Sequence, residues 1–182
     1  MSEFTMDLES IRRQARTNLE QGAVTADYRA DRAKVLQLLD GALATEWLCV
    51  LRYTQHSIAA EGIYAESVAK HFASHAAQEL DHANQLANRI KQLGGNPNLA
   101  PESFSKRGHS EYKECNSLDE MIRENLVAER IAIQSYSEMI RYIGESDATT
   151  RRLLEGILET EEEHADEMAD LLAAFDPREK LN

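Results

Sequence analysis

The chain is poor in the residues that interrupt helices or crosslink small domains, with three prolines, eight glycines and two cysteines among 182 residues. Strand-type runs of Val, Ile and Thr are also missing, while Ala, Leu, Glu, Arg and Gln, which favour helices, dominate. Cys49 and Cys115 are far apart and form no CxxC motif, which excludes a disulfide scaffold and fits a reducing compartment. Because 42% of the residues are apolar, the chain can form a hydrophobic core. Together with the helix-forming composition, this predicts one all-α domain.

An excess of basic residues and a long apolar run are both absent. There are 20 Lys and Arg against 32 Asp and Glu, so the net charge is −12. This balance argues against binding to nucleic acid, whose phosphates need basic neighbours, and is compatible with attraction of cations. No apolar stretch approaches the length of about 18 residues that a membrane helix needs, so no membrane partner is expected. The opening residues, MSEFTMDLES, lack the layout of a signal peptide, and we expect a cytoplasmic protein.

The pattern along the chain divides it into three parts. Residues 1–34 are charged and thinly apolar, and we expect an extension with one short helix. Residues 35–176 form the main domain, and residues 177–182 form a tail. Within the main domain, four segments combine helical apolar spacing with stop signals at their ends. They span approximately residues 33–61, 65–93, 118–143 and 147–175.

The connections between these helices are unequal in length. Short turns at Gly62 and Gly144 join the first helix to the second and the third to the fourth. The second and third helices are separated by the polar stretch 96–116, which ends at a capping box formed by Ser117 and Glu120. A connection this long is uncommon in a compact domain unless it has a purpose, such as carrying the chain along a bundle. The pattern predicts a four-helix bundle with one long crossover.

Two Glu-x-x-His motifs are the strongest chemical signal. Glu79 and His82 lie in the second long helix, and Glu161 and His164 lie in the fourth. Residues three apart project from one helix face, so each pair can hold a metal ion with a carboxylate and an imidazole. One such motif is a weak signal in an acidic helical chain, but two on these two helices are much rarer.

The first and third helices each carry a carboxylate within an apolar stripe. The stripe around Glu46 is made of Leu36, Leu39, Leu43, Val50 and Ile58. The stripe around Glu129 is made of Leu118, Ile122, Leu126, Ile133 and Ile140. A buried carboxylate is costly unless it is paired or binds a metal, so we expect both to converge with the two motifs at mid-bundle.

Spacing shows that the two halves of the domain repeat one pattern. Glu46 precedes Glu79 by 33 residues, and Glu129 precedes Glu161 by 32. A tyrosine follows the lone glutamate by seven residues in each half, at Tyr53 and Tyr136. These tyrosines are expected either to orient ligand carboxylates by hydrogen bonds or to be core aromatics. Four carboxylates balance two divalent cations, for which iron or manganese is suited and zinc is acceptable.

These motifs resemble those of bacterioferritin and its ferritin-like relatives over residues 36–175. The segment EWLCVLRYTQH is similar to the family's Glu, Tyr and His pattern, LGGNPNL to its turn after the second helix, and ILETEEEH to its fourth-helix motif. The resemblance implies a ferritin-like four-helix bundle with a ferroxidase centre for two iron ions in each subunit. The ligands that it implies are Glu46, Glu79, His82, Glu129, Glu161 and His164, with Glu79 and Glu161 bridging.

Departures from bacterioferritin bear on the cofactor and the assembly. Leu80 stands where the family carries a haem-ligating Met, so no haem is expected by that route. The chain ends 18 residues after His164, without room for the fifth helix that lines the channel of the twenty-four-subunit cage. The N-terminal extension and the missing fifth helix are more similar to Dps-like ferritins, so a dodecamer is favoured over a 24-mer or a dimer. The paired cysteines of that group are not clearly reproduced, since Ile131 stands two residues after Glu129.

Two further histidines lie near the second-helix motif. His71 and His75 precede Glu79 by eight and four residues, on nearly the same helix face. They could line a route for iron, or they could be satisfied by neighbours or exposed at the helix end. Both alternatives stay open from the sequence.

The first helix carries residues away from the ligand face. His56 is expected at the surface or at an interface, and Trp47 at a subunit contact. Cys49, one turn after Glu46, is expected to be a small buried residue, with redox activity near iron as the alternative. Exposed apolar positions on the first two long helices are expected to make a dimer contact.

The function expected from these residues is oxidation and storage of iron. Fe(II) would bind at the six ligands, with O₂ or H₂O₂ as oxidant, and Fe(III) would collect in a homo-oligomer. A second reading is a di-metal enzyme that stores nothing, either a rubrerythrin-like peroxidase or a manganese catalase. A third is a structural bundle that binds no metal, in which buried Glu46 and Glu129 would be destabilising.

Overall fold

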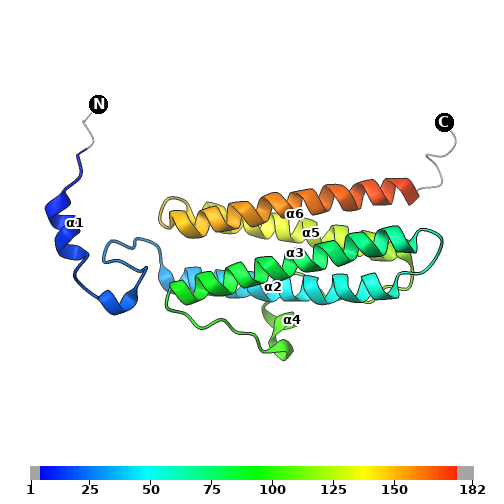
Figure 1. The fold of residues 1–182 in the computed structure, drawn as a ribbon, viewed down its shortest axis with the longest axis horizontal. Helices are drawn as coiled ribbons and strands as arrows, with labels where there is room; N and C mark the ends of the chain where they lie inside the picture. The colour runs from blue at the N-terminus through cyan, green and yellow to red at the C-terminus, as the bar shows by residue number, and fades with distance from the viewer. Residues whose placement is uncertain (1–4, 176–182) are drawn as a thin grey trace.

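The computed structural model describes residues 5–175, and the regular elements within this range are all helical (Figure 1). In chain order they are α1 (Leu8–Gln14), the short 3-10 helix η1 (Leu19–Gln21), α2 (Arg32–Ala59), α3 (Ala65–Gln92), η2 (Pro101–Ser103), α4 (Phe104–Arg107), α5 (Leu118–Ile143) and α6 (Ala148–Phe175). The all-α prediction is confirmed, and the four long helices begin and end within two residues of the expected positions. The predicted tail at 177–182 lies outside the described residues.

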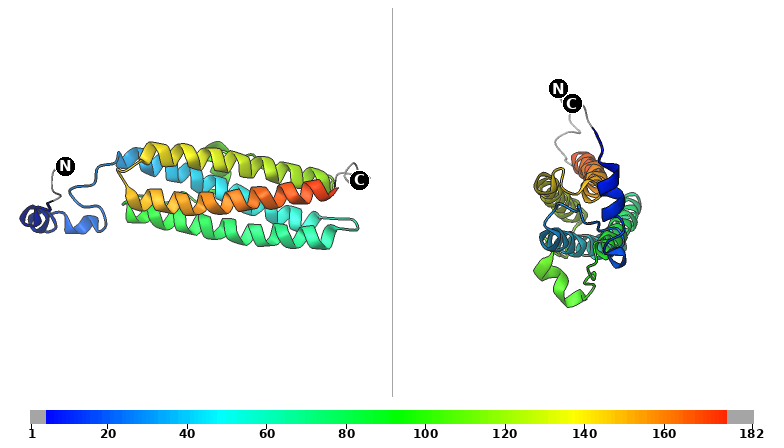
Figure 2. Two further views of the ribbon diagram at one scale, coloured as in Figure 1. Left: turned by 90° about the horizontal axis from the view of Figure 1, so that it is seen from above. Right: turned by 90° about the vertical axis from the view of Figure 1, so that its left-hand side faces the viewer.

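The four long helices lie side by side as two antiparallel hairpins (Figures 1 and 2). One hairpin is α2 with α3, and the other is α5 with α6. Between them the chain returns along the whole bundle, so α3 and α5 run in the same direction. The extension, with α1 and η1, lies beyond one end of the bundle. The predicted four-helix bundle with a long crossover is therefore confirmed.

The starts of α5 and α6 are fixed by side chains that accept hydrogen bonds from free backbone N–H groups. The Ser117 hydroxyl accepts from the backbone N–H of Glu120 at 3.2 Å, and the Glu120 carboxylate accepts from the N–H of Asn116 at 2.9 Å. The Asp147 carboxylate accepts from the N–H of Thr150 at 2.9 Å. Ser117 thus caps α5 as predicted, with Glu120 bound to the residue before the cap, and Asp147 caps α6.

The crossover is attached along α2. The ring of Phe104 stacks on Trp47 with centroids 6.0 Å apart and planes only 4° from parallel. The backbone N–H of His109 donates to the Thr45 hydroxyl at 2.9 Å. The structure therefore gives Trp47, expected at a subunit contact, an aromatic partner within its own chain.

A buried arginine ties the crossover to two long helices. Arg52 of α2 is 2% exposed; its Nε donates to Asn125 Oδ1 of α5 at 2.9 Å, and its Nη1 donates to the Ser110 hydroxyl at 3.1 Å. His56 receives a hydrogen bond from the Asn125 amide at 3.1 Å and donates from Nε2 to the carbonyl of Lys113 at 3.2 Å. The expectation of a surface or interface position for His56 is wrong, because the crossover covers this face and leaves its ring 0% exposed.

One member of the predicted α2 stripe does not reach the core. Ile58 is 80% exposed, whereas Leu39 and Leu43 are fully buried. Ile58 follows the buried His56 by two residues, which turns it about 200° around the helix. Its inclusion in the buried stripe was wrong.

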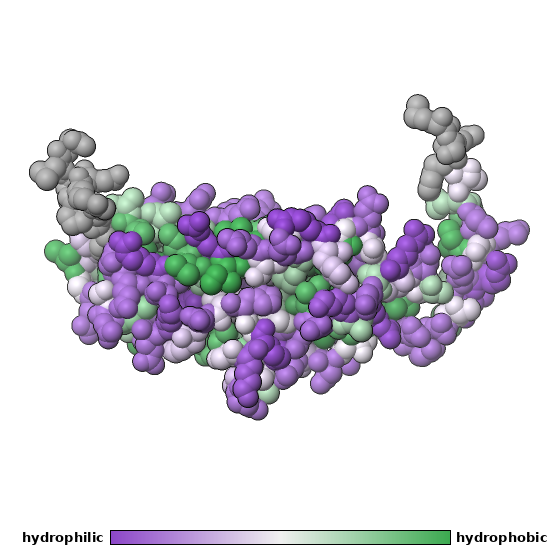
Figure 3. Space-filling model, turned by 180° about the vertical axis from the view of Figure 1, so that it is seen from behind, coloured by the Kyte–Doolittle hydropathy of each residue, from purple (hydrophilic) through white to green (hydrophobic). Residues whose placement is uncertain are grey.

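The face seen in Figure 3 is mostly hydrophilic, with hydrophobic side chains gathered in places over the bundle. Exposed large apolar residues of α2 and α3 include Leu51, Ile58 and Leu80. A dimer contact at these positions stays a prediction. Along the described part of the chain, no helix combines the length and apolar character needed to cross a membrane.

Candidate metal centre

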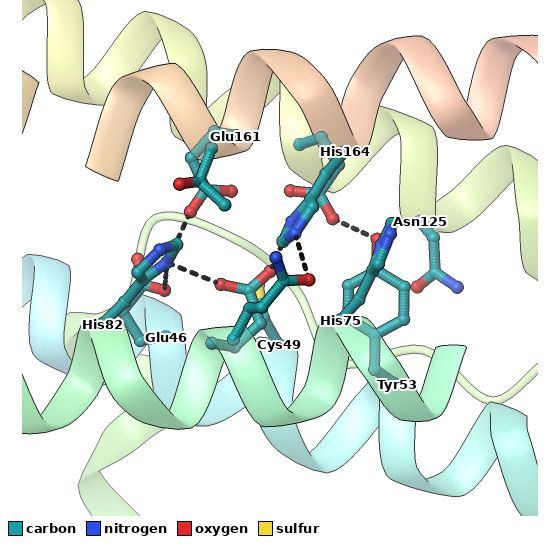
Figure 4. Close-up of polar contacts among 12 residues, drawn as sticks. Glu46, Cys49, Tyr53, His75, His82, Asn125, Glu161 and His164 are labelled. Atoms are coloured by element: carbon teal, nitrogen blue, oxygen red, sulfur yellow. Dashed lines mark hydrogen bonds and ion pairs between the residues drawn. The ribbon is translucent and has the colours of Figure 1, made fainter. Parts of the chain in front are cut away.

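Side chains from all four long helices meet in the interior of the bundle (Figure 4). The six residues singled out from the sequence are each at most 5% exposed. They form two overlapping groups of four whose ligand atoms lie within 4.8 Å of one another. One group is Glu46, Glu79, His82 and Glu161; the other is Glu79, Glu129, Glu161 and His164. Glu79 and Glu161 belong to both groups, which is the position that bridging ligands occupy.

The imidazole of His82 is surrounded by carboxylates. Its Nδ1 lies 3.0 Å from Glu161 Oε1, 3.1 Å from Glu79 Oε2 and 3.4 Å from Glu46 Oε2. Two atoms that are each about 2.1 Å from one metal ion lie roughly 3.0 to 3.4 Å apart when the angle at the metal is between 90° and tetrahedral. These separations therefore suit ligands that share an ion.

The orientation of His164 is set by a residue that sequence reasoning missed. Its Nε2 donates to Gln78 Oε1 at 3.1 Å, and its Nδ1 lies 3.3 Å from Glu79 Oε1. With Nε2 held by this outer partner, Nδ1 faces the centre, where it would be the atom that binds a metal ion. Gln78 precedes Glu79 in the sequence, but its contact with α6 has no signal in helical periodicity.

The two repeated tyrosines act across the halves of the bundle. The Tyr53 hydroxyl of α2 donates to Glu129 Oε1 of α5, and the Tyr136 hydroxyl of α5 donates to Glu46 Oε1 of α2. Both tyrosines are at most 1% exposed. The expected hydrogen bonds are present, and each tyrosine orients the lone glutamate of the other half.

Each of the four carboxylates has one buried oxygen that accepts no well-aligned hydrogen bond, although three of these oxygens lie 3.0–3.4 Å from an imidazole nitrogen. The buried atoms in this condition at the centre are Glu46 Oε2, Glu79 Oε1, Glu129 Oε2, Glu161 Oε1 and His164 Nδ1. A buried polar atom without a partner costs about 1–3 kcal/mol, and more if it is charged. Five such atoms that belong to one centre fit a site built for cations.

Protonation of the centre reflects crowding of the carboxylates. Burial, followed by the negative charge of Glu79, raises the pKa of each of the other three carboxyl groups. Burial alone would raise the pKa of Glu79 as well, but the neighbouring imidazoles of His164 and His82 lower it. Burial would lower the pKa of His82, yet the neighbouring carboxylates raise it. Protons thus offset the negative charge, and divalent cations could replace them.

Solvent approaches the centre between α3 and α6. A hollow of about 580 Å³ is lined there by Gln78, Asp81, His82, Gln85 and Thr160, among others. Of the six candidate ligands, only His82 lines this hollow. The side of the centre nearest His82 therefore has the shorter route to water.

Three residues close to the candidate ligands in the sequence do not belong to the centre. Glu162 and Glu163, beside the α6 motif, are exposed. Cys49 is 2% exposed, its Sγ lies 3.6 Å from Arg52 Nη2, and burial raises the pKa of its thiol. A buried thiol with a raised pKa is a poor nucleophile, which agrees with a packing role.

Comparison with known proteins places this geometry in context. A family model described as a ferritin-like domain matches residues 36–176. Bacterioferritin of Desulfovibrio desulfuricans is 29% identical over 141 residues, which cover 76% of this chain and 75% of the relative. Bacterioferritin of Rhodobacter capsulatus is 27% identical over 147 residues, which cover 79% and 86%. Among solved structures, the bacterioferritin-related protein of Bacteroides fragilis, described as a dodecameric thioferritin, has a TM-score of 0.80 at 28% identity, covering 84% of this chain and 92% of that one.

Proposed function

The chain belongs to the ferritin-like family, and from the contents of its centre we propose that it oxidises Fe(II) and stores the product. Two Fe(II) ions per chain are the substrate, O₂ or H₂O₂ is the oxidant, and a homo-oligomeric shell retains Fe(III). The proposed ligands are the six residues Glu46, Glu79, His82, Glu129, Glu161 and His164.

One observation carries this proposal. Four buried carboxylates, each with an oxygen that accepts no well-aligned hydrogen bond, lie with two imidazoles in two overlapping groups. Without cations this arrangement is costly, whereas two divalent ions match its four negative charges. Carboxylate and imidazole together suit iron or manganese, and zinc can also bind.

The protein residues divide the work by position. Glu46 and Glu129 each belong to one group, while Glu79 and Glu161 belong to both and would be shared between two bound ions. The tyrosine contacts and the Gln78 contact hold the ligand atoms before any ion arrives, so little reorganisation is needed on binding. Oxidation of two Fe(II) ions to Fe(III) would supply two electrons, which together with two protons reduce H₂O₂ to two molecules of water or O₂ to H₂O₂.

No haem is expected from the position next to Glu79. Leu80 has no ligand atom, and its side chain is 39% exposed on the outside of α3. This remains a prediction, and it is checked by the absence of a Soret band after incubation of the purified protein with haemin.

A dodecamer is the proposed assembly. The bacterioferritin-related protein of Bacteroides fragilis, with the same fold over 84% of this chain, is described as dodecameric. The exposed apolar residues Leu51 and Ile58 of α2 offer surface for subunit contacts.

The test is aerobic addition of several hundred Fe(II) per chain, followed by size-exclusion chromatography with light scattering and iron analysis. Storage predicts hundreds of irons eluting with a dodecameric particle. Two irons per chain on a dimer would refute storage and favour a non-storage di-metal enzyme. Glu46→Gln should lose iron oxidation, whereas Glu163→Gln, which removes the same charge from an exposed position, should retain it. Equal activity in the two variants would contradict the assignment of the centre.

A further inference from the structure

Three side chains outside the six-residue centre form another group with ligand spacing. His71 and His75 of α3 and Glu167 of α6 have ligand atoms within 4.8 Å of one another. His75 Nε2 lies 2.9 Å from Glu167 Oε2, and His71 Nδ1 lies 3.4 Å from the same oxygen. Both imidazoles therefore contact the same carboxylate oxygen.

The arrangement has the chemistry of a mononuclear metal site. Histidines four residues apart lie on one helix face, which is the spacing by which helices grip zinc in other proteins. Two imidazoles and one carboxylate form the ligand set of many Fe(II) and Zn²⁺ sites. Separations of 2.9 and 3.4 Å fall close to the roughly 3.0–3.4 Å expected for atoms about 2.1 Å from a shared ion.

Burial changes steeply across these three residues. The side chains of His71 and Glu167 are 43% and 51% exposed, while that of His75 is 2% exposed. A shallow hollow of about 450 Å³ at the surface is lined by Ser67, Lys70, His71 and Ser74. The Lys70 ammonium is paired with Glu66 at 2.8 Å, which offsets part of its charge. An ion can thus reach the group from solvent without opening the bundle.

His75 also touches the inner centre. Its ring stacks on that of His164, with centroids 3.8 Å apart and planes within 15° (Figure 4). A nitrogen of His75 also lies within 4.8 Å of ligand atoms of Glu129 and His164. Its Nδ1 is buried and has no hydrogen-bond partner. One imidazole therefore separates the outer group from the inner ligands.

We propose that His71, His75 and Glu167 form a third site in each chain, which holds one divalent transition-metal ion on the solvent side of the inner centre. The two rings and one oxygen leave coordination positions open to water. The outer ion is held one side chain from His164, so this site is where a cation would first bind on its way inward.

Equilibrium dialysis of the metal-free full-length protein against Zn²⁺, with metal analysis, tests this site directly. Wild type should bind three ions per chain, while His71→Ala and Glu167→Gln should each bind two. The affinity for the third ion should fall by at least about tenfold, since even outer partners of ligands affect affinity by that much. Glu163→Gln, which removes one negative charge from an exposed position of the same helix, should still bind three.

The outcomes separate this proposal from the ferroxidase centre. Two ions in wild type that both survive Glu167→Gln would overturn the third site and leave the inner centre intact. One ion in wild type that Glu167→Gln abolishes would support the third site and refute the inner one. Equal losses in Glu163→Gln and Glu167→Gln would mean that charge alone attracts the ion, and would also overturn the proposal.

Discussion

Around Glu46 and His82 the centre lies beside an open hollow, whereas around Glu129 and His164 it lies behind the imidazole of His75. Both sides have one lone glutamate, one histidine and the two shared carboxylates. The candidate ligands on the two sides are thus equivalent in kind, while their surroundings are not.

The internal repeat therefore accounts for the candidate ligands, but it does not account for their access to solvent. The repeat duplicates the ligands and the tyrosine contacts, because both arise from equal spacing along paired helices. Access depends on residues outside the repeat: Thr160 and Gln85 by the hollow, and His71, His75 and Glu167 on the other side. Two ions bound by matching ligands are therefore expected to exchange with solvent at different rates.

Loss of a carboxylate shared by the two groups should weaken binding on both sides of the centre. Glu161→Gln removes an oxygen used by both groups, so affinity for both inner ions should fall by roughly 100-fold or more, and iron oxidation should fall with it. Zinc dialysis and the initial rate of Fe(II) oxidation measure this. The exposed neighbour Glu162 supplies the control, as Glu162→Gln. Retention of one inner ion at wild-type affinity would show that Glu161 does not bridge.

Loss of one lone glutamate should leave half of the centre. Glu46→Gln and Glu129→Gln should each bind one inner ion fewer than wild type, because each carboxylate belongs to one group. The ion remaining in Glu129→Gln lies beside the hollow, so a chelator should remove it several-fold faster than the ion remaining in Glu46→Gln. Equal release rates would show that the hollow does not control access.

The tyrosines offer a smaller and symmetrical perturbation. Tyr53→Phe should weaken binding at the Glu129 side, and Tyr136→Phe at the Glu46 side, each by about tenfold, because the partner carboxylate loses its orienting donor. Isothermal titration with Zn²⁺ resolves the two effects, and Tyr142→Phe, at a 54% exposed position, is the control. Unchanged affinity in both variants would reduce the tyrosines to core packing.

A change at the turn of the second hairpin should leave the centre untouched and alter only stability. Asp147 accepts hydrogen bonds from Arg89 at 2.8 Å, from Thr150 and from the Tyr28 hydroxyl at 2.8 Å. Removing one partner of a buried ion pair typically costs about 3–5 kcal/mol, so Asp147→Asn should lower the free energy of unfolding by about 3 kcal/mol at pH 7. Urea unfolding measures the loss, while zinc stoichiometry should stay at the wild-type value.

At acid pH the difference in the free energy of unfolding between wild type and Asp147→Asn should shrink. Burial alone would raise the pKa of Asp147, but hydrogen bonds from Thr150, Tyr28 and Arg89 lower it. A carboxyl group whose pKa is lowered on folding stabilises above its unfolded pKa of about 4 and loses this effect as the pH falls further. The gap between wild type and Asp147→Asn should hold from pH 7 to 5 and narrow below about pH 4. A gap that widens in acid would reverse the assigned sign.

The fold and the six inner residues could be predicted because periodicity and spacing carry them. The apolar periodicity and the stop signals of each helix indicate its buried face and its ends. The repeat singles out Glu46 and Glu129 among 32 acidic residues. The burial of His56 could not be predicted in this way. Helix α2 is covered on two sides, by the bundle and by the crossover, whereas a single apolar stripe indicates only one covered face.

The third site, formed by His71, His75 and Glu167, could also be predicted only in part. His71 and His75 could be recognised as a pair because they share a helix face. Glu167 lies 92 residues from His75 along the chain, and its contact depends on the relative rotation of α3 and α6. Helical periodicity does not fix that rotation, so an exposed glutamate in an acidic stretch gave no signal.

The reciprocal tyrosine contacts also bear on ancestry. Each hairpin supplies three of the six inner ligands and one tyrosine, and each tyrosine orients a glutamate of the other hairpin. Two copies of α2–α3 placed about a two-fold axis would contain the same inventory, with each Tyr53 facing the other copy's Glu46. The chain thus has the internal symmetry of a homodimer of hairpins, and the crossover joins the two hairpins covalently.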